Sequence, residues 1–186
     1  MIIKGVPLAT KERSLLERLR FHEGRVGAMT KPTSVERGAF HGWSFPVFNN
    51  DDQEVFGKMF VPGRWNGSSD ITVYLRTCLA AAEDVGDKFK FQLSWNTQPS
   101  TGILPSSTVN VEVQQAVSTG RAAQYDIYDL EYTLVYNHES LLAPVVPRSI
   151  VAFRIRRVAS DSPAISGQVI LLEGWAKYVI DKAYTE

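Results

Sequence analysis

The feature that most constrains this sequence is an alternation of apolar and polar residues with a period of two. It is clearest in residues 89–95 (FKFQLSW), where each large apolar residue is followed by a polar one. Because successive side chains of a β-strand point to opposite faces, this pattern predicts a strand with one buried and one exposed face. The same alternation recurs in residues 71–75, 109–113, 128–136 and 151–155.

Three further segments complete a set of eight predicted strands. Residues 43–48 and 55–61 precede the alternating runs, and a long final strand covers residues 168–180. Turn-forming residues cluster between the strands, without interleaved helices, so we predict an antiparallel two-sheet sandwich or a closed barrel. The side chains that we expect in its core are Phe91, Leu93, Trp95, Leu130, Tyr132, Phe153 and Ile155.

The N-terminal segment has a different character. Thr10 is a good N-cap, residues 14–23 contain neither Gly nor Pro, and Gly24 follows, so the pattern predicts a short helix over residues 10–23. Its leucines form a narrow apolar stripe, which suits a helix lying on a surface of its own body or of a neighbour. Residues 24–39 are rich in Gly, Ser, Thr, Pro and charge, and we interpret them as a linker.

The charge distribution divides the chain at the same place. The chain has no formal net charge, but residues 1–40 hold eight basic and four acidic residues, a net charge of +4 that the remainder balances. We therefore divide the protein into a basic arm, residues 1–40, and a body, residues 41–186. A basic arm predicts contact with a negative partner surface, and a solvated helix of mixed charge is the alternative. The candidate contact residues are Arg13, Leu15, Leu16, Arg18, Leu19, Arg20 and Arg25.

No catalytic or metal-binding pattern stands out. The sequence lacks phosphate-binding loops, nucleophile elbows and zinc-protease motifs, and its three histidines are far apart. The acidic pairs Asp51–Asp52 and Glu83–Asp84 fall in turns, where carboxylates usually cap backbone groups. The single cysteine, Cys78, excludes an intrachain disulfide and is expected in the core. We therefore expect no enzymatic activity, metal or cofactor.

Composition narrows the class of protein further. Hydrophobic residues make up 44% and charged residues 22% of 186, which is typical of a globular domain and not of a disordered chain. No apolar run approaches the roughly 20 residues of a membrane-spanning helix, and the N-terminus lacks the apolar stretch of a signal peptide. We expect a soluble protein made in a cytoplasm, binding neither membrane nor nucleic acid.

Trp65 lies in a loop by composition, PGRWNGSS, and two interpretations follow. An indole in such a loop either plugs the end of the sandwich or faces a partner as an exposed contact, and we favour the plug because large aromatic residues are mostly buried. A carbohydrate-binding function would need exposed aromatic rings, for which Trp65, Tyr125 and Tyr184 are the candidates.

Three stretches together resemble a known group of proteins. They are residues 60–75 (FVPGRWNGSSDITVYL), residues 89–95 (FKFQLSW), and residues 150–158 (IVAFRIRRV) followed by residues 166–178. In this order they are similar to jelly-roll virion structural proteins of tailed bacteriophages, known as capsid decoration, cement or minor structural proteins. The resemblance covers about residues 43–180 and leaves the arm outside it.

The resemblance implies a fold and a function. The fold would be an all-β, eight-stranded antiparallel jelly roll, a β-sandwich with an N-terminal arm that contains a short helix. The function would be that of a non-enzymatic cement protein on the capsid surface, associated as a trimer and bound to the major capsid protein or other virion proteins. A tail, neck or fibre component, or a carbohydrate-binding module for host recognition, are the alternatives.

Overall fold

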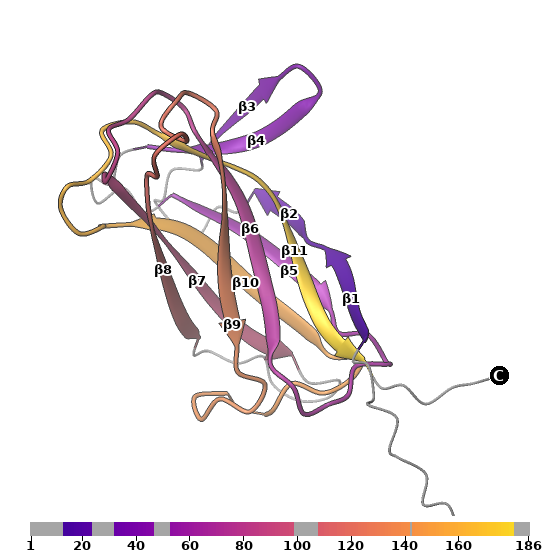
Figure 1. Cartoon of the computed structure of the whole chain (residues 1–186). Helices are drawn as coiled ribbons and strands as arrows, with labels where there is room; N and C mark the ends of the chain where they lie inside the picture. The colour runs from indigo at the N-terminus through magenta and orange to yellow at the C-terminus, as the bar shows by residue number, and fades with distance from the viewer. Residues whose placement is uncertain (1–12, 24–31, 47–52, 99–107, 142, 181–186) are drawn as a thin grey trace, which may run out of the picture.

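The computed structural model describes residues 13–23, 32–46, 53–98, 108–141 and 143–180. The regular secondary structure of these residues consists of β-strands alone, and Figure 1 shows the strands stacked as two layers. The strands are β1 (Arg13–Arg18), β2 (Arg20–Glu23), β3 (Thr33–Arg37), β4 (Phe40–Phe45), β5 (Glu54–Phe60), β6 (Ile71–Leu79), β7 (Lys88–Gln98), β8 (Val109–Ala116), β9 (Ile127–Leu134), β10 (Ile150–Val158) and β11 (Val169–Ile180).

The strands form two antiparallel sheets. Sheet A has the order β3-β4-β11-β6-β9, and β1 also pairs with β11; sheet B has the order β2-β5-β10-β7-β8. If β4 to β11 are numbered one to eight, sheet A contains strands 1-8-3-6 and sheet B contains strands 2-7-4-5. This alternation between the layers is the strand order of a jelly roll, which is built from two Greek keys.

The eight predicted strands correspond to β4 through β11, so the two-sheet sandwich is confirmed. The expected count of eight is too low, because β1, β2 and β3 bring the described residues to eleven strands. All three extra strands lie in the segment that we assigned to the arm. The boundary at residue 40 stays a prediction, although residues 13–23 add strands to both sheets of the body.

The predicted helix over residues 10–23 is wrong. Residues 13–18 pair with β11, with Arg13 opposite Ile180, and residues 20–23 pair with β5. Edges of both sheets supply hydrogen-bond partners along this segment, and such tertiary pairing outweighs the small intrinsic preference of leucine and arginine for helix. Residues 10–12 and 24–31 of the predicted helix and linker lie outside the described residues, whereas β3 occupies residues 33–37 of that linker.

The core lies between the two sheets. All seven side chains that we predicted to be buried are buried, none more than 4% exposed, which confirms the faces chosen from the alternation. Aromatic rings meet edge to face across the core, Phe45 against Phe91 at 5.1 Å and Phe89 against Tyr128 at 5.6 Å between centroids. Such pairs add about 0.5–1.5 kcal/mol each beyond their burial, so they help to hold the two sheets together.

Candidate functional site

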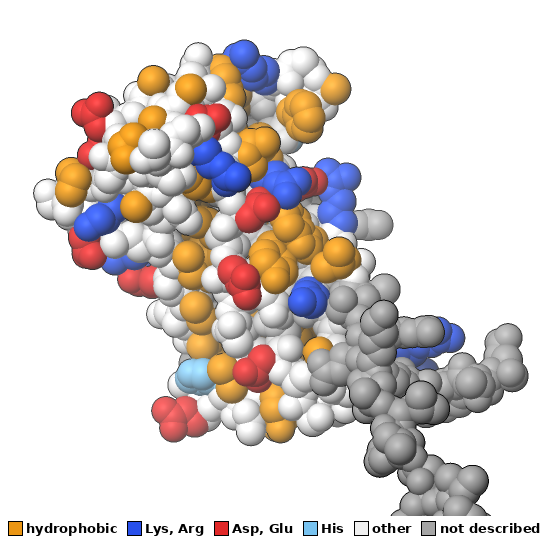
Figure 2. Space-filling model, viewed as in Figure 1, with side chains coloured by type: hydrophobic (Ala, Val, Ile, Leu, Met, Phe, Trp, Pro, Cys, Tyr) orange, Lys and Arg blue, Asp and Glu red, His pale blue; other side chains and the backbone are white. Residues whose placement is uncertain are grey.

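The two outer faces of the sandwich differ in chemistry. Sheet A carries exposed apolar side chains, among them Leu16 on β1, Phe40 on β4 and Ile127 on β9. Figure 2 shows this face, with hydrophobic side chains gathered over its centre and charged side chains around them. The outer face of sheet B carries amides, hydroxyls and charges, with Phe60 of β5 as an exposed apolar side chain. An apolar centre with a charged rim is typical of protein contact surfaces, so sheet A is the first candidate.

Tyr74 and Trp175 form the centre of the sheet A face. The two residues lie opposite each other on β6 and β11, and their rings stack at 5.4 Å between centroids and 17° between planes. The guanidinium carbon of Arg76 lies 4.8 Å from the centroid of the same indole. The indole is therefore held by two neighbours on β6, which makes a fixed, partly exposed aromatic platform.

Charged side chains border this pair. Arg76 donates hydrogen bonds of 2.8 and 3.0 Å to the two carboxylate oxygens of Asp129, and a third of 3.1 Å to Glu173. Arg18 lies 3.7 Å from Glu173. These pairs are about a third or more exposed, so each contributes only about 0–1 kcal/mol to stability. Their main effect is to fix where the charges lie around the aromatic rings.

The ionisation of Tyr74 and Arg76 reflects this border. Partial burial and the neighbouring Glu131 carboxylate, which accepts a hydrogen bond from Tyr74, raise the pKa of the Tyr74 phenol. The hydrogen bonds from Arg76 to Asp129 raise the pKa of the Arg76 guanidinium. Both side chains therefore keep their protons well above neutral pH.

The β3–β4 hairpin projects beside this face (Figure 1). Phe40 is 70% exposed, and the Arg37 guanidinium carbon lies 3.5 Å from the centroid of the Tyr125 ring. A groove of about 1120 Å³ lies beside the hairpin on this face, and its lining combines the apolar Phe40, Trp43 and Leu172 with charged residues such as Arg76 and Glu173. A projecting apolar side chain next to a groove is a second element suited to contact with another protein.

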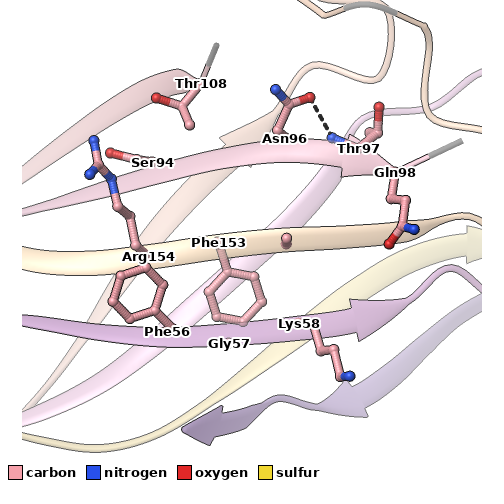
Figure 3. Close-up of a pocket in the computed structure, with 11 residues that line it drawn as sticks. Phe56, Gly57, Lys58, Ser94, Asn96, Thr97, Gln98, Thr108, Phe153 and Arg154 are labelled. Carbon is pink, nitrogen blue, oxygen red and sulfur yellow. Dashed lines mark hydrogen bonds between the residues drawn. The ribbon is translucent and has the colours of Figure 1, made fainter. Parts of the chain in front are cut away.

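The outer face of sheet B carries a hydrogen-bonded polar row. Arg156 Nε donates to Gln92 Oε1 at 2.7 Å, and Gln92 Nε2 donates to Glu112 Oε1 at 2.9 Å, which links β10, β7 and β8. Lys90 lies 3.3 Å from the same Glu112 carboxylate. Next to this row, a groove of about 470 Å³ crosses β5, β10 and β7 (Figure 3).

The predicted arm residues lie in different places. Arg18 and Leu16 are exposed on β1, Leu16 by 62%, whereas Leu19 is 4% exposed and packs in the core of its own chain. Leu19 is therefore not available to a partner. Arg13, Leu15 and Arg20 lie in β1 and β2 by their backbone, and Arg25 lies outside the described residues.

Trp65 is a plug and not an exposed contact. Its side chain is 2% exposed, its Nε1 donates to Ser69 Oγ at 3.1 Å, and its ring meets Tyr136 edge to face at 6.0 Å. The loop closes around it because Asn66 Oδ1 accepts hydrogen bonds from the backbone N–H groups of Ser68 and Ser69. The suggestion of an exposed contact was therefore wrong, because the Asn-Gly-Ser-Ser turn folds back over the indole.

Of the three aromatic residues named for carbohydrate binding, the two that the structure describes do not form an exposed pair of rings. Trp65 is buried, Tyr125 is partly covered by Arg37, and Tyr184 lies outside the described residues. The partly exposed aromatic pair that sequence reasoning missed is Tyr74 and Trp175. Tyr74 stands on the polar side of the alternation in residues 71–75. An aromatic residue at a polar position is the sequence signal from which it could have been found.

Two other reactive side chains, Cys78 and Arg157, are buried within the fold. Burial raises the pKa of the Cys78 thiol to about 11 and lowers the pKa of Arg157 to about 10. Arg157 donates two hydrogen bonds of 2.8 Å to the carbonyl oxygens of Pro46 and Gly167, so it holds two loops together. Within the described ranges, His, Cys, Asp and Glu side chains nowhere gather in threes that could hold a metal ion, and none of the segments forms a helix long and apolar enough to cross a membrane.

Comparisons with known proteins find similarity of fold at low identity. No family model and no curated protein matches the sequence. Dimeric latent PorU from Porphyromonas gingivalis matches with a TM-score of 0.42 and 13% identity, over 91% of this chain and 13% of that one. A non-crystalline cellulose specific carbohydrate-binding module matches with a TM-score of 0.41 and 15% identity, over 83% and 85% of the two chains. Infectious bursal disease virus, Gx strain, matches with a TM-score of 0.31 and 8% identity, over 98% and 39%. At these scores the comparisons assign neither a family nor a function.

Proposed function

We propose that this chain is a non-enzymatic structural protein of a virion, a cement or decoration protein that binds and stabilises the capsid shell of a tailed bacteriophage. Its partners are the major capsid protein or other virion proteins, and its place is the capsid surface. The resemblance of residues 43–180 to such proteins suggests this function, and the jelly-roll strand order of the body agrees with it.

The observation that carries the proposal is the sheet A face around Tyr74 and Trp175. A partly exposed, stacked aromatic pair bordered by fixed charges, with Phe40 projecting beside it, has the composition of a contact surface and not of a catalytic cleft. Burying Trp175, Tyr74 and Phe40 against a shell supplies the affinity, and the charges of Arg18, Lys177 and Glu131 orient the docking.

Self-association as a trimer belongs to the same proposal. A cement protein gains from several weak contacts made at once, because linked copies bind with a high effective concentration. The exposed edge strands β9 and β8 are alternative places for contacts between copies.

Reconstitution with particles that lack the protein tests this function. Purified chain is added to such particles, and binding is measured by co-sedimentation and located by cryo-electron microscopy. We expect density on the shell and loss of binding in the Trp175→Ala and Phe40→Ser variants. The control is Val85→Ser, which removes an apolar side chain exposed in the turn between β6 and β7.

Other locations would contradict the proposal. Density confined to the tail or neck would overturn the cement function and leave a structural role at another site. Normal shell binding by Trp175→Ala and Phe40→Ser would show that the sheet A face is not the contact surface. Absence of the chain from purified virions would overturn the structural function altogether.

A further inference from the structure

We propose that the groove on the outer face of sheet B binds an acidic oligosaccharide. The groove lies on the face opposite to the Tyr74–Trp175 surface, so this inference goes beyond the proposed structural function and does not depend on it. It gives the same chain a second, ligand-binding face.

The register of three strands creates the groove. On β10 the small residue Ala152 stands between Lys58 of β5 and Asn96 of β7, which are its direct partners in the sheet. Longer side chains surround this position, so Ala152 forms the floor of a hollow of about 470 Å³. That volume lies within the usual range of about 300–1,000 Å³ for small-molecule sites.

Unpartnered polar atoms lie in the wall of the groove. Ser94 is 1% exposed, and its hydroxyl has no hydrogen-bond partner within the protein; the same holds for the buried Nε of Arg154. Ser94 and Arg154 lie directly opposite each other on β7 and β10, and Figure 3 shows both at the same end of the groove. Buried polar groups normally have partners, so a ligand or an ordered water that reaches these two atoms would gain hydrogen bonds.

The charge of the groove selects for an anionic ligand. Among the described residues that line it, the charged ones are Lys58 and Arg154, and there is no carboxylate. Glu54 lies 3.3 Å from Arg154 Nη1, and this ion pair orients the guanidinium. Figure 3 shows Lys58 and Arg154 directed toward different ends of the groove. Because Arg154 is ion-paired with Glu54, Lys58 supplies the main positive charge for an acidic group of the ligand.

The remaining lining favours a sugar over a peptide. Asn96, Gln98 and Thr108 add amides and a hydroxyl, and Phe56 with Ala152 adds an apolar surface, which together match the hydroxyls and the C–H faces of sugar rings. A peptide in extended form usually binds by adding a strand to a free sheet edge. Here β5, β10 and β7 each pair with a strand on both sides, so no free edge is offered.

Isothermal titration of the full chain tests the proposal with four probes. Hyaluronan tetrasaccharide carries carboxylates, heparin tetrasaccharide carries sulfates as well, fully N-acetylated chitotetraose has the same length without charge, and tetraglutamate is an acidic peptide. We expect one or both acidic tetrasaccharides to bind at least about tenfold more tightly than chitotetraose and tetraglutamate, a difference of about 1.4 kcal/mol. Hyaluronan and heparin distinguish carboxylate from sulfate as the recognised group.

Matched variants locate the site. Lys58→Gln, at an exposed position, should weaken binding of the acidic tetrasaccharide about tenfold, because one charge-assisted contact is lost. Lys177→Gln makes the same charge change on sheet A and should leave binding unchanged. Ala152→Leu, which fills the floor of the groove, should abolish binding. Thermal unfolding of each variant verifies that it is folded, and Lys58→Gln decides the question if Ala152→Leu does not fold.

Several results would overturn the inference. They are no binding of either acidic tetrasaccharide, equal binding of chitotetraose, tighter binding of tetraglutamate, or unchanged binding by a folded Lys58→Gln variant. Shell binding is measured separately and involves the opposite face, so failure of the groove leaves the structural function standing, and the reverse also holds.

Discussion

The backbone N–H of Leu19 donates a 2.8 Å hydrogen bond to the carbonyl oxygen of Gly174, at the point where the chain passes from sheet A to sheet B. A Cβ atom on residue 174 would lie 2.8 Å from Phe21 Cζ and 3.0 Å from Leu19 Cδ1. Glycine therefore leaves the space in which Leu19 and Phe21 enter the core. This contact joins the N-terminal segment to the body far along the sequence.

Two leucines on this segment should differ sharply in their contribution to stability. Leu19→Ala should lower the free energy of unfolding by about 2–5 kcal/mol, because a buried side chain leaves a cavity. Leu16→Ala, on the exposed side of β1, should change it by less than about 0.5 kcal/mol. Urea unfolding followed by circular dichroism measures both. Equal, small effects would mean that the N-terminal segment does not pack as described.

Gly174→Ala tests the same contact from the other side. The added methyl group must displace Phe21 and Leu19, and overpacking of this kind costs about 1–3 kcal/mol. Lys177→Ala, an exposed change on the same strand, is the control and should leave the urea midpoint nearly unchanged. An unchanged midpoint for Gly174→Ala would show that the segment has room to move away at no cost.

The strands of the body could be predicted from the sequence because each has a local pattern of its own. In β7 and β9 each strand carries its own alternation, so the buried faces of Phe91 and Leu130 follow from the strand alone. The N-terminal segment is different, because its leucines fit a helix or a strand equally well. What decides between them is the free edges of β11 and β5, which are more than thirty residues away in the sequence.

The candidate sites could not be predicted from the sequence for a related reason. Trp175 and Tyr74 become a pair only through the register of β11 against β6, and the groove exists only because Ala152 stands between Lys58 and Asn96. Trp65 illustrates the opposite case. Its burial was correctly favoured, because the Asn-Gly-Ser-Ser turn that covers it is local.

Cys78 should make stability depend on pH in the alkaline range. The pKa of its thiol rises from an ordinary value of 9.0 to about 11 on folding, because burial disfavours the thiolate. Between these values the unfolded thiol loses its proton while the folded one keeps it, so stability is fully present below about pH 9 and falls as the pH rises toward 11. Wild type and Cys78→Ala should therefore differ in the slope of unfolding free energy against pH in this window.

The same burial should protect the thiol chemically. The thiolate is the reactive form, so alkylation by iodoacetamide at pH 8 should be slow in the folded protein and fast in urea. A free peptide containing cysteine is the control for the reagent. Rapid labelling without denaturant, or identical pH slopes for wild type and Cys78→Ala, would contradict the burial of this side chain.

Two truncations separate the arm as an attachment device from the arm as part of the fold. Deletion of residues 1–12 leaves every described strand in place and should leave the melting temperature nearly unchanged.

Deletion of residues 1–23 removes β1 and β2, exposes the edges of β11 and β5, and uncovers the core where Leu19 and Phe21 packed. The cavity left by Leu19 alone costs about 2–5 kcal/mol, a large part of the 5–15 kcal/mol that stabilises a typical domain. Unpaired edges also promote aggregation. Differential scanning calorimetry and light scattering should therefore show a strongly lowered melting temperature and association for the longer deletion. If that variant instead melts like wild type and stays monodisperse, β1 and β2 contribute little to the stability of the sandwich. That result would support the hypothesis that the N-terminal segment is an attachment arm.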